Sequence, residues 1–265
     1  MSATTQLTPD QTNSLDVLAE IIRFHAPLVA FTGAGISTES GIPDYRGPQG
    51  LWTTGSARPF TYEDFMSNPD ARREWWRNLP ERLAQAEAQQ PNQGHEALVR
   101  IERASVMLAS ITQNIDGLHQ VAGSDAERVI ELHGNTRTIR CTNCGTVFPV
   151  RDFLDRVVVQ DDPPPCPRCG GILKSGTIAF GQPMPQDEMR VAFAVAAQAG
   201  VMLVVGSTLM VNPAARVPAV AKAAGAYLAI INLGETAMDA EADLVVHAAA
   251  GPALTYLADR LIGQS

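Results

Sequence analysis

The chain has 265 residues, of which 45% are hydrophobic and 18% charged, a composition that excludes an intrinsically disordered protein. Its net charge of −8 gives no general electrostatic reason to bind nucleic acid or an anionic membrane, so we expect neither partner. No apolar run approaches the roughly 18 residues that a membrane helix needs. The start of the chain carries Asp10, Asp16 and Glu20, which argues against a secretory or transit signal. We therefore predict a cytoplasmic monomer, in a compartment where thiols stay reduced.

The first predicted element is a helix. Thr8-Pro9-Asp10-Gln11 combines a threonine cap, a proline at the first helical position and a glutamine that closes a capping box. Pro27 ends this helix, and the apolar run 28–31 that follows is typical of a buried strand.

This pairing of helix and buried strand recurs along the chain. We predict helices near 94–102, 186–199, 213–224 and 254–261, and strands at 106–111, 201–205, 227–231 and 244–246. Buried strands that alternate with helices form parallel sheets covered on both faces. The fold class is therefore α/β, with a Rossmann-like doubly wound sheet built from residues 1–46, 92–136 and 176–265.

Two segments interrupt the alternation. Residues 47–91 are rich in charged and aromatic residues and predict a helical insertion, whereas residues 137–175 hold all four cysteines. We expect both insertions to pack together beside the main sheet.

The cysteines form two knuckles, Cys141-x2-Cys144 and Cys166-x2-Cys169. This spacing is suited to tetrahedral Zn²⁺ with no open coordination position, so we predict a structural zinc-ribbon module; a redox CxxC pair is the alternative.

Polar or glycine-rich residues follow four of the predicted strands. Gly33-Ala34-Gly35 follows the first strand, where a loop could approach a pyrophosphate, although Thr38 replaces the third glycine of the usual dinucleotide pattern. A tight turn would look the same. Carboxyl ends of parallel strands are where ligands bind, so the four segments should share one rim. They are 33–37, 113–116, 206–208 and 232–234.

Two further features carry possible chemistry. The loop 39–47 places an acid, an aromatic and a base together, as in a mobile cover over a nucleotide. His133, followed by Gly134, would be able to titrate in a cleft, although a lone histidine is more often structural. The segment 112–119 likewise has a structural alternative, because its Asn and Asp residues would also suit the capped start of a helix.

The chain resembles the sirtuin family over nearly its whole length. The motifs that carry the resemblance are GAGISTESGIPDYRG (33–47), PNQGHEAL (91–98), TQNIDGLH (112–119), ELHG (131–134), the paired knuckles, AFG (179–181), GSTLMVNP (206–213) and INLGET (231–236). The resemblance implies an NAD-dependent protein-lysine deacylase that transfers the acyl group to ADP-ribose and releases nicotinamide, with NAD as co-substrate and acyl-lysine proteins or peptides as partners.

The resemblance also implies the roles of individual residues. The catalytic residues would be His133, as general base, and Asn114. The residues that would bind NAD are Gly33, Ala34, Gly35, Ser37, Thr38, Asp44, Tyr45, Arg46, Gln113, Asn114, Ile115, Asp116, His133, Gly206, Ser207, Thr208, Asn232, Leu233, Gly234 and Ala250. The peptide backbone would pair with Ile178, Ala179, Phe180 and Gly181, and the zinc ligands would be Cys141, Cys144, Cys166 and Cys169.

The chain departs from the family pattern in three ways. Sirtuins usually have phenylalanine at Tyr45 and an acid at Gln182, and the Tyr45 variant resembles the class II branch. Trp76 and Leu79 replace the Tyr-x-x-Arg pair of the succinyl-removing branch, so acidic acyl chains are not expected as substrates. ADP-ribosyl transfer to protein, NAD hydrolysis and a non-catalytic NAD-sensing role are the alternative functions.

Overall fold

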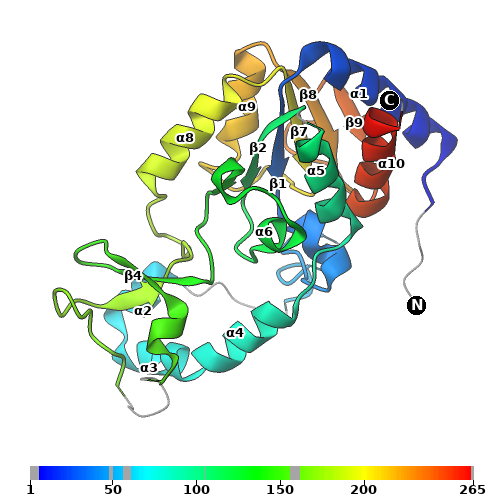
Figure 1. Cartoon of the computed structure of the whole chain (residues 1–265). Helices are drawn as coiled ribbons and strands as arrows, with labels where there is room; N and C mark the ends of the chain where they lie inside the picture. Colours follow the sequence, from blue (N-terminus) through cyan, green and yellow to red (C-terminus); the bar gives the residue numbers. More distant parts are fainter. Residues whose placement is uncertain (1–5, 48–49, 56–60, 105, 156–161, 264–265) are drawn as a thin grey trace.

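A six-stranded parallel sheet with the order β3-β2-β1-β7-β8-β9 forms the core of the upper part of the molecule in Figure 1. The computed structural model describes residues 6–47, 50–55, 61–104, 106–155 and 162–263. Residues 48–49, 56–60 and 156–161 of the two predicted insertions lie outside this description. The strands are β1 (Leu28–Thr32), β2 (Met107–Thr112), β3 (Val129–Glu131), β7 (Val201–Val205), β8 (Tyr227–Ile231) and β9 (Leu244–Val246).

Helices cover both faces of this sheet, as predicted. Leu28 and Ala30 of β1 pack into one core cluster and Val29 and Phe31 into the other, because successive side chains of a strand point to opposite faces. The first face carries α1 (Pro9–His25), α5 (Gln93–Arg103) and α10 (Ala250–Ile262), and the second carries α8 (Gln186–Ala196) and α9 (Arg216–Ala223).

The ends of several elements follow from local chemistry. The predicted capping box of α1 is present: Gln11 N donates to Thr8 Oγ1, and Thr8 N donates to Gln11 Oε1. The segment after β1 forms a 3₁₀ helix, η1 (Ala34–Ser40). Short elements then connect β2 to β3, namely α6 (Leu118–Ala122) and η2 (Ala126–Arg128).

The two insertions pack against each other, as expected. The first contains α2 (Tyr62–Ser67), α3 (Pro69–Arg77) and α4 (Leu79–Ala88); the second contains an antiparallel sheet of β5 (Val147–Pro149), β4 (Thr138–Cys141) and β6 (Leu173–Ser175), with η3 (Val150–Phe153). Trp76 and Leu83 of the helices share a buried cluster with Ile139, Phe153 and Leu173. The antiparallel sheet agrees with the predicted zinc-ribbon class, whereas the division into domains stays a prediction.

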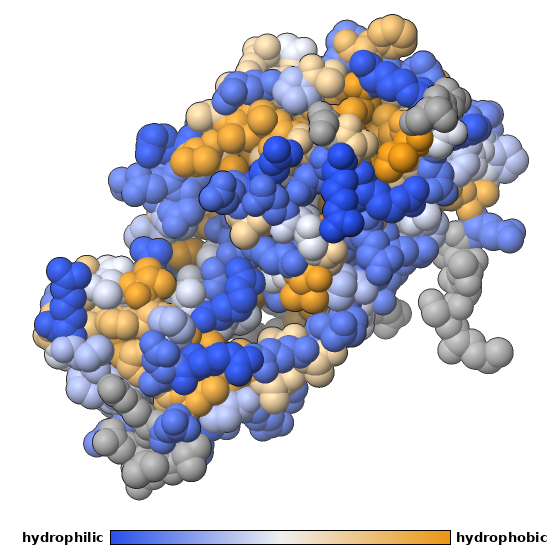
Figure 2. All heavy atoms as spheres, viewed as in Figure 1, coloured by the Kyte–Doolittle hydropathy of each residue, from blue (hydrophilic) through white to orange (hydrophobic). Residues whose placement is uncertain are grey.

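In the same view, the surface is mostly hydrophilic, and hydrophobic side chains gather in patches, one of them over α8 (Figure 2). Among the described residues, none of the helices has both the length and the apolar character needed to cross a bilayer.

The central strand allows a test of the core. Phe31 is fully buried in β1, so Phe31→Ala should lower the free energy of unfolding by about 3–5 kcal/mol. The matched control is Phe24→Ala on α1, because Phe24 is 80% exposed and its loss should change stability by less than about 0.5 kcal/mol. Urea denaturation measures both variants, and equal losses would contradict this arrangement of the core.

Candidate functional site

A cavity of about 930 Å³ lies at the carboxyl ends of β1, β2, β7 and β8. The four strand-end segments predicted to share a rim all line it. So do the cover loop, His133 and the segment 178–181, and thus every residue predicted to contact NAD or peptide. The structure therefore brings all these residues together, although the contact that each makes with a ligand stays a prediction.

Glycines allow the strand-end loops to touch at the floor of this cavity. Gly35 N donates to Gly206 O at 2.9 Å, and a Cβ added to Gly35 would lie 2.6 Å from Gly206 Cα. A Cβ at Gly33 would lie 2.7 Å from Gly206 O. These glycines are therefore required for the approach of one loop to its neighbour. Their predicted role beside a pyrophosphate is a separate matter that this contact does not test.

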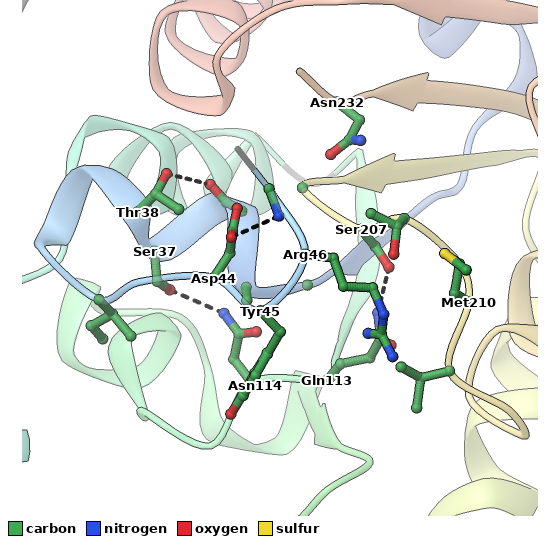
Figure 3. Close-up of a pocket in the computed structure, with 18 of the residues that line it drawn as sticks. Ser37, Thr38, Asp44, Tyr45, Arg46, Gln113, Asn114, Ser207, Met210 and Asn232 are labelled. Carbon is green, nitrogen blue, oxygen red and sulfur yellow. Dashed lines mark hydrogen bonds between the residues drawn. The ribbon is translucent and has the colours of Figure 1, made fainter. Parts of the chain in front are cut away.

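The Ser37 hydroxyl is the centre of a buried polar network (Figure 3). It donates to Asp116 Oδ2 at 2.8 Å. It also accepts from Asn114 Nδ2 at 3.0 Å, the bond that Figure 3 shows. Because Asn92 N donates to His95 Nδ1, the proton of His95 lies on Nε2, which faces Ser37 Oγ at 3.5 Å. A hydroxyl offers one donor and two acceptor positions, so that of Ser37 is fully used. We therefore interpret Ser37 as a residue that positions Asn114 and Asp116.

The histidines behind this network are neutral. Burial lowers the pKa of His95 to about 4 and that of His119 to about 3. His119 Nε2 lies 2.9 Å from Thr32 Oγ1, which donates to Thr112 Oγ1, and this oxygen accepts from Asn114 N. Neither histidine lines the cavity.

His133 is held in one tautomer. Its Nδ1 lies 2.7 Å from the carbonyl oxygen of Gln113, and because a carbonyl only accepts, the proton must lie on Nδ1. Nε2 therefore has a lone pair available on a residue that lines the cavity. Burial lowers the pKa of the His133 imidazole, while the bond to Gln113 opposes this shift. His133 is therefore held as a neutral base whose acceptor atom is Nε2.

The backbone of His133 also supports the segment that precedes Phe180. His133 O accepts from Ile178 N at 2.8 Å. The turns beside this bond are in close contact, since a Cβ at Gly134 would lie 2.0 Å from Gly176 O. Lys174, only 5% exposed, donates through Nζ to the carbonyls of Ser175 and Thr177. The position of Lys174 was not predicted, because no local pattern in the sequence marks it.

The segment 178–181 uses part of its hydrogen-bonding capacity within the protein. Ala179 N donates to Gln182 Oε1 at 3.1 Å, and Phe180 O accepts from Tyr62 N at 2.8 Å. Gln182 thus occupies a main-chain donor, which gives the departure at this position a structural role. Phe180 also forms a parallel bridge with Thr61, whereas Gly181 N has no protein acceptor among the described residues.

Trp52 also lines the cavity, although the sequence did not predict it as a site residue. Its ring lies 5.1 Å from that of Tyr45 and 5.2 Å from that of Phe180, measured between centroids. The Arg46 guanidinium lies over the same ring at 4.3 Å. Trp52 therefore connects the cover loop with the segment 178–181. The aromatic residues of the insertion were a signal that could have indicated this.

Trp76 and Leu79 do not line the cavity. Both are buried in the cluster between the insertions, where the Trp76 ring packs on Phe153 at 6.0 Å. The expectation that these two positions decide the acceptance of acidic acyl chains is thus not supported by where their side chains lie.

The four cysteine sulfurs lie within 4.8 Å of one another and form no disulfide. The distance is 3.5 Å between the Sγ atoms of Cys141 and Cys169 and 3.9 Å between those of Cys144 and Cys166. Tetrahedral Zn²⁺ with Zn–S bonds of about 2.3 Å requires sulfurs roughly 3.8 Å apart. Asn143 N and Cys144 N also point to Cys141 Sγ, as they would toward a thiolate. The donor set therefore fits one zinc ion, which would stabilise the module.

Zinc should be present at about one ion per chain and should be lost in Cys141→Ser, with destabilisation of residues 137–175. Val147→Ser is the control, because Val147 is exposed on β5 and leaves all four thiols in place. Metal analysis and limited proteolysis measure the two effects. A zinc-free purified protein with an intact module would contradict the assignment.

Comparisons with known proteins agree with this site. The model of the Sir2 family matches residues 33–213, more than half of the chain. The NAD-dependent protein deacetylase 1 of Pyrobaculum aerophilum is 44% identical over 252 residues, which cover 95% of this chain and 96% of the relative. The NAD-dependent protein deacetylase 2 of Streptomyces coelicolor is 43% identical over 87% of this chain and 96% of its own length.

Solved structures give the same result. A Sir2 structure with a p53 peptide and NAD+ has a TM-score of 0.78 and 35% identity, and the match covers 94% of this chain and 97% of that one. The sequence match and the fold thus agree along almost the entire length, and the chain belongs to the Sir2 family of sirtuins.

Proposed function

We propose that the chain is an NAD-dependent protein-lysine deacylase. The observation that carries this proposal is the fixed tautomer of His133, whose Nε2 is available as a base in the cavity between the strand ends and the segment 178–181. Curated relatives are named NAD-dependent protein deacetylases, and one of them a deacylase, which supports the same reaction class.

The nicotinamide end of NAD would lie against Asp116 and Ile115. Asp116 Oδ1 accepts from Leu118 N and Oδ2 from Ser37 Oγ, but a carboxylate has about four acceptor positions. Each oxygen therefore retains one position for the carboxamide N–H. Gln113 and Ser207, joined by a hydrogen bond of 2.8 Å, would lie beside the ribose and phosphates.

The acyl-peptide would use the backbone groups that the protein leaves open. Gly181 N is an available donor, so we expect the peptide backbone to pair with the segment 178–181 at that group. Phe180 and Trp52 would line the path of the lysine side chain.

The proposed reaction needs one general base close to the ribose of NAD. NAD supplies an electron-poor ribose carbon and a nicotinamide leaving group. His133 Nε2 would accept a proton from a ribose hydroxyl, while the bond from Nδ1 to Gln113 O holds the ring in place. The acyl oxygen would bond to the ribose carbon as nicotinamide leaves, and water would then allow the free lysine to leave while the acyl group stays on ADP-ribose. We also expect a cytoplasmic monomer without nucleic-acid or membrane partners.

The function is tested by His133→Ala. Loss of the base should lower kcat for acyl-peptide-dependent nicotinamide release by about 100-fold or more. His25→Ala is the control, because His25 is exposed at the end of α1 and does not line the cavity. Nicotinamide release at full rate without acyl-peptide would instead favour NAD hydrolysis or ADP-ribosyl transfer to protein.

The pH dependence of the rate should report His133. Burial lowers its pKa below the ordinary value of about 6.5, and only the neutral ring can accept a proton. With both substrates saturating, log kcat should stay level through this pH and fall only below it, with a slope of about one. A midpoint clearly above 6.5, or a level profile shared with His133→Ala, would contradict the role of His133 as the base.

A further inference from the structure

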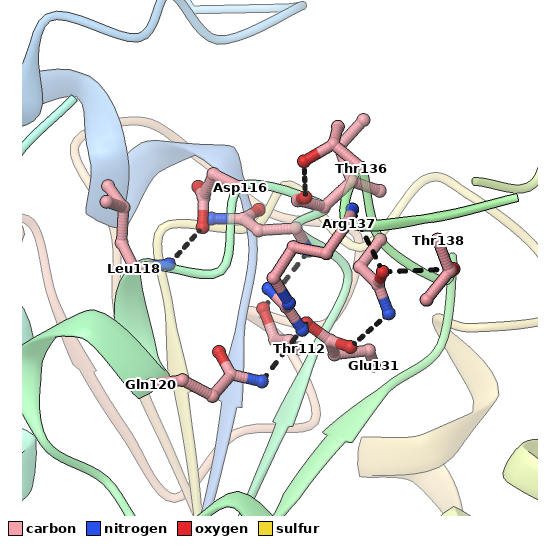
Figure 4. Close-up of polar contacts among 11 residues, drawn as sticks. Thr112, Asp116, Leu118, Gln120, Glu131, Thr136, Arg137 and Thr138 are labelled. Carbon is pink, nitrogen blue, oxygen red and sulfur yellow. Dashed lines mark hydrogen bonds and ion pairs between the residues drawn. The ribbon is translucent and has the colours of Figure 1, made fainter. Parts of the chain in front are cut away.

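The Glu131 carboxylate, which does not line the cavity, accepts hydrogen bonds from three side chains (Figure 4). Its Oε1 accepts from Arg137 Nη2 at 2.7 Å and from Gln120 Nε2 at 3.1 Å, and its Oε2 accepts from Asn135 Nδ2 at 2.7 Å. The Glu131 side chain is only 14% exposed, whereas that of Arg137 is 46% exposed. The carboxylate end of the ion pair is therefore partly shielded from water, and two further donors fix it besides Arg137.

Arg137 and its neighbour support the turn that would face nicotinamide. The Arg137 guanidinium covers Gly117, since a Cβ added to Gly117 would lie 2.0 Å from Nη1. Thr136 donates through both N and Oγ1 to Ile115 O at 3.3 Å. The turn 115–117 is thus held from outside by residues 136–137, while the Ser37 hydroxyl holds it from inside.

The same carboxylate lies two residues before the base. Glu131 ends β3 and is paired with Thr112 of β2, and Leu132 N donates to Thr112 O at 2.9 Å. His133 follows directly. Glu131 is therefore connected to both groups that would contact the nicotinamide riboside. It is linked to the turn at Ile115 through Arg137, and it lies two residues before His133 in the chain.

We infer that the Glu131–Arg137 ion pair positions the turn 115–117 relative to His133 and so determines the affinity for the nicotinamide end of NAD. This inference rests on the proposed function. Both residues are positioning residues, because neither lines the cavity. When the pair is broken, the turn loses its outer support, whereas the peptide segment keeps its own bonds through Ile178 and Gln182.

The test is Arg137→Met, which removes the charge and keeps much of the side-chain volume. The KM for NAD and the inhibition constant of nicotinamide should each rise about tenfold, and the KM for acyl-peptide should change less than about twofold. Arg100→Met is the matched control, because Arg100 forms an ion pair of the same 2.7 Å length with Asp259 far from the cavity. It should leave all three constants unchanged.

Two more variants separate positioning from loss of structure. Arg137→Lys keeps the charge and should recover part of the NAD affinity. Glu131→Gln should act through the same pair, so the double variant with Arg137→Met should be no worse than about twofold beyond the stronger single variant. Unchanged nucleotide constants in Arg137→Met, equal losses for peptide and NAD, or fully additive effects would each overturn the inference.

Calorimetric titration with NAD keeps this result distinct from the proposed function. If the unmodified enzyme and Arg100→Met release no nicotinamide with acyl-peptide, the proposed function fails. If both are active and Arg137→Met binds NAD with unchanged affinity, only the inference about the ion pair fails.

Discussion

The contact between two strand-end loops, at Gly35 and Gly206, is the constraint on which the site depends. Parallel strands present their carboxyl ends at one edge, but the loops that follow would normally be kept apart by their side chains. Here the backbone of one loop lies directly on the backbone of the next, and Gly35 N donates to Gly206 O. Polar groups from four strands are therefore collected around one cavity instead of spreading along the edge of the sheet.

Two side chains that line this cavity have their hydrogen bonds fixed within the protein. Ser37 uses its donor and both acceptor positions, and His133 is fixed by a backbone carbonyl. Because a buried polar group without a partner costs about 1–3 kcal/mol, such a network favours one arrangement strongly over alternatives. The protein's own bonds thus hold Ser37, Asn114 and His133 in place, which lowers the reorganisation needed at the reacting atoms.

Much of this fold could be predicted from the sequence because its signals are local. The strands 201–205, 227–231 and 244–246 occur at the predicted residues, since continuous apolar runs between glycines and polar residues mark buried strands. The strand β3 was missed: it has only three residues, all partly buried, and no alternation to detect. The role of Trp52 and the bonds of Lys174 were missed for another reason. They depend on where distant segments meet, which no spacing along the chain encodes.

The contact of Gly134 with Gly176 has a consequence for building chimeras from related enzymes. One glycine follows the base, and the other lies at the exit of the zinc-bearing insertion, where a Cβ would lie 2.0 Å from Thr138 Oγ1. In a chimera whose grafted segment carries a larger residue in place of Gly176, the added side chain would clash with Thr138. The backbone of Gly134, next to His133, would then have to shift. The cysteine-containing insertion therefore cannot be exchanged by itself. Gly176 has to be transferred together with the turn that contains His133 and Gly134.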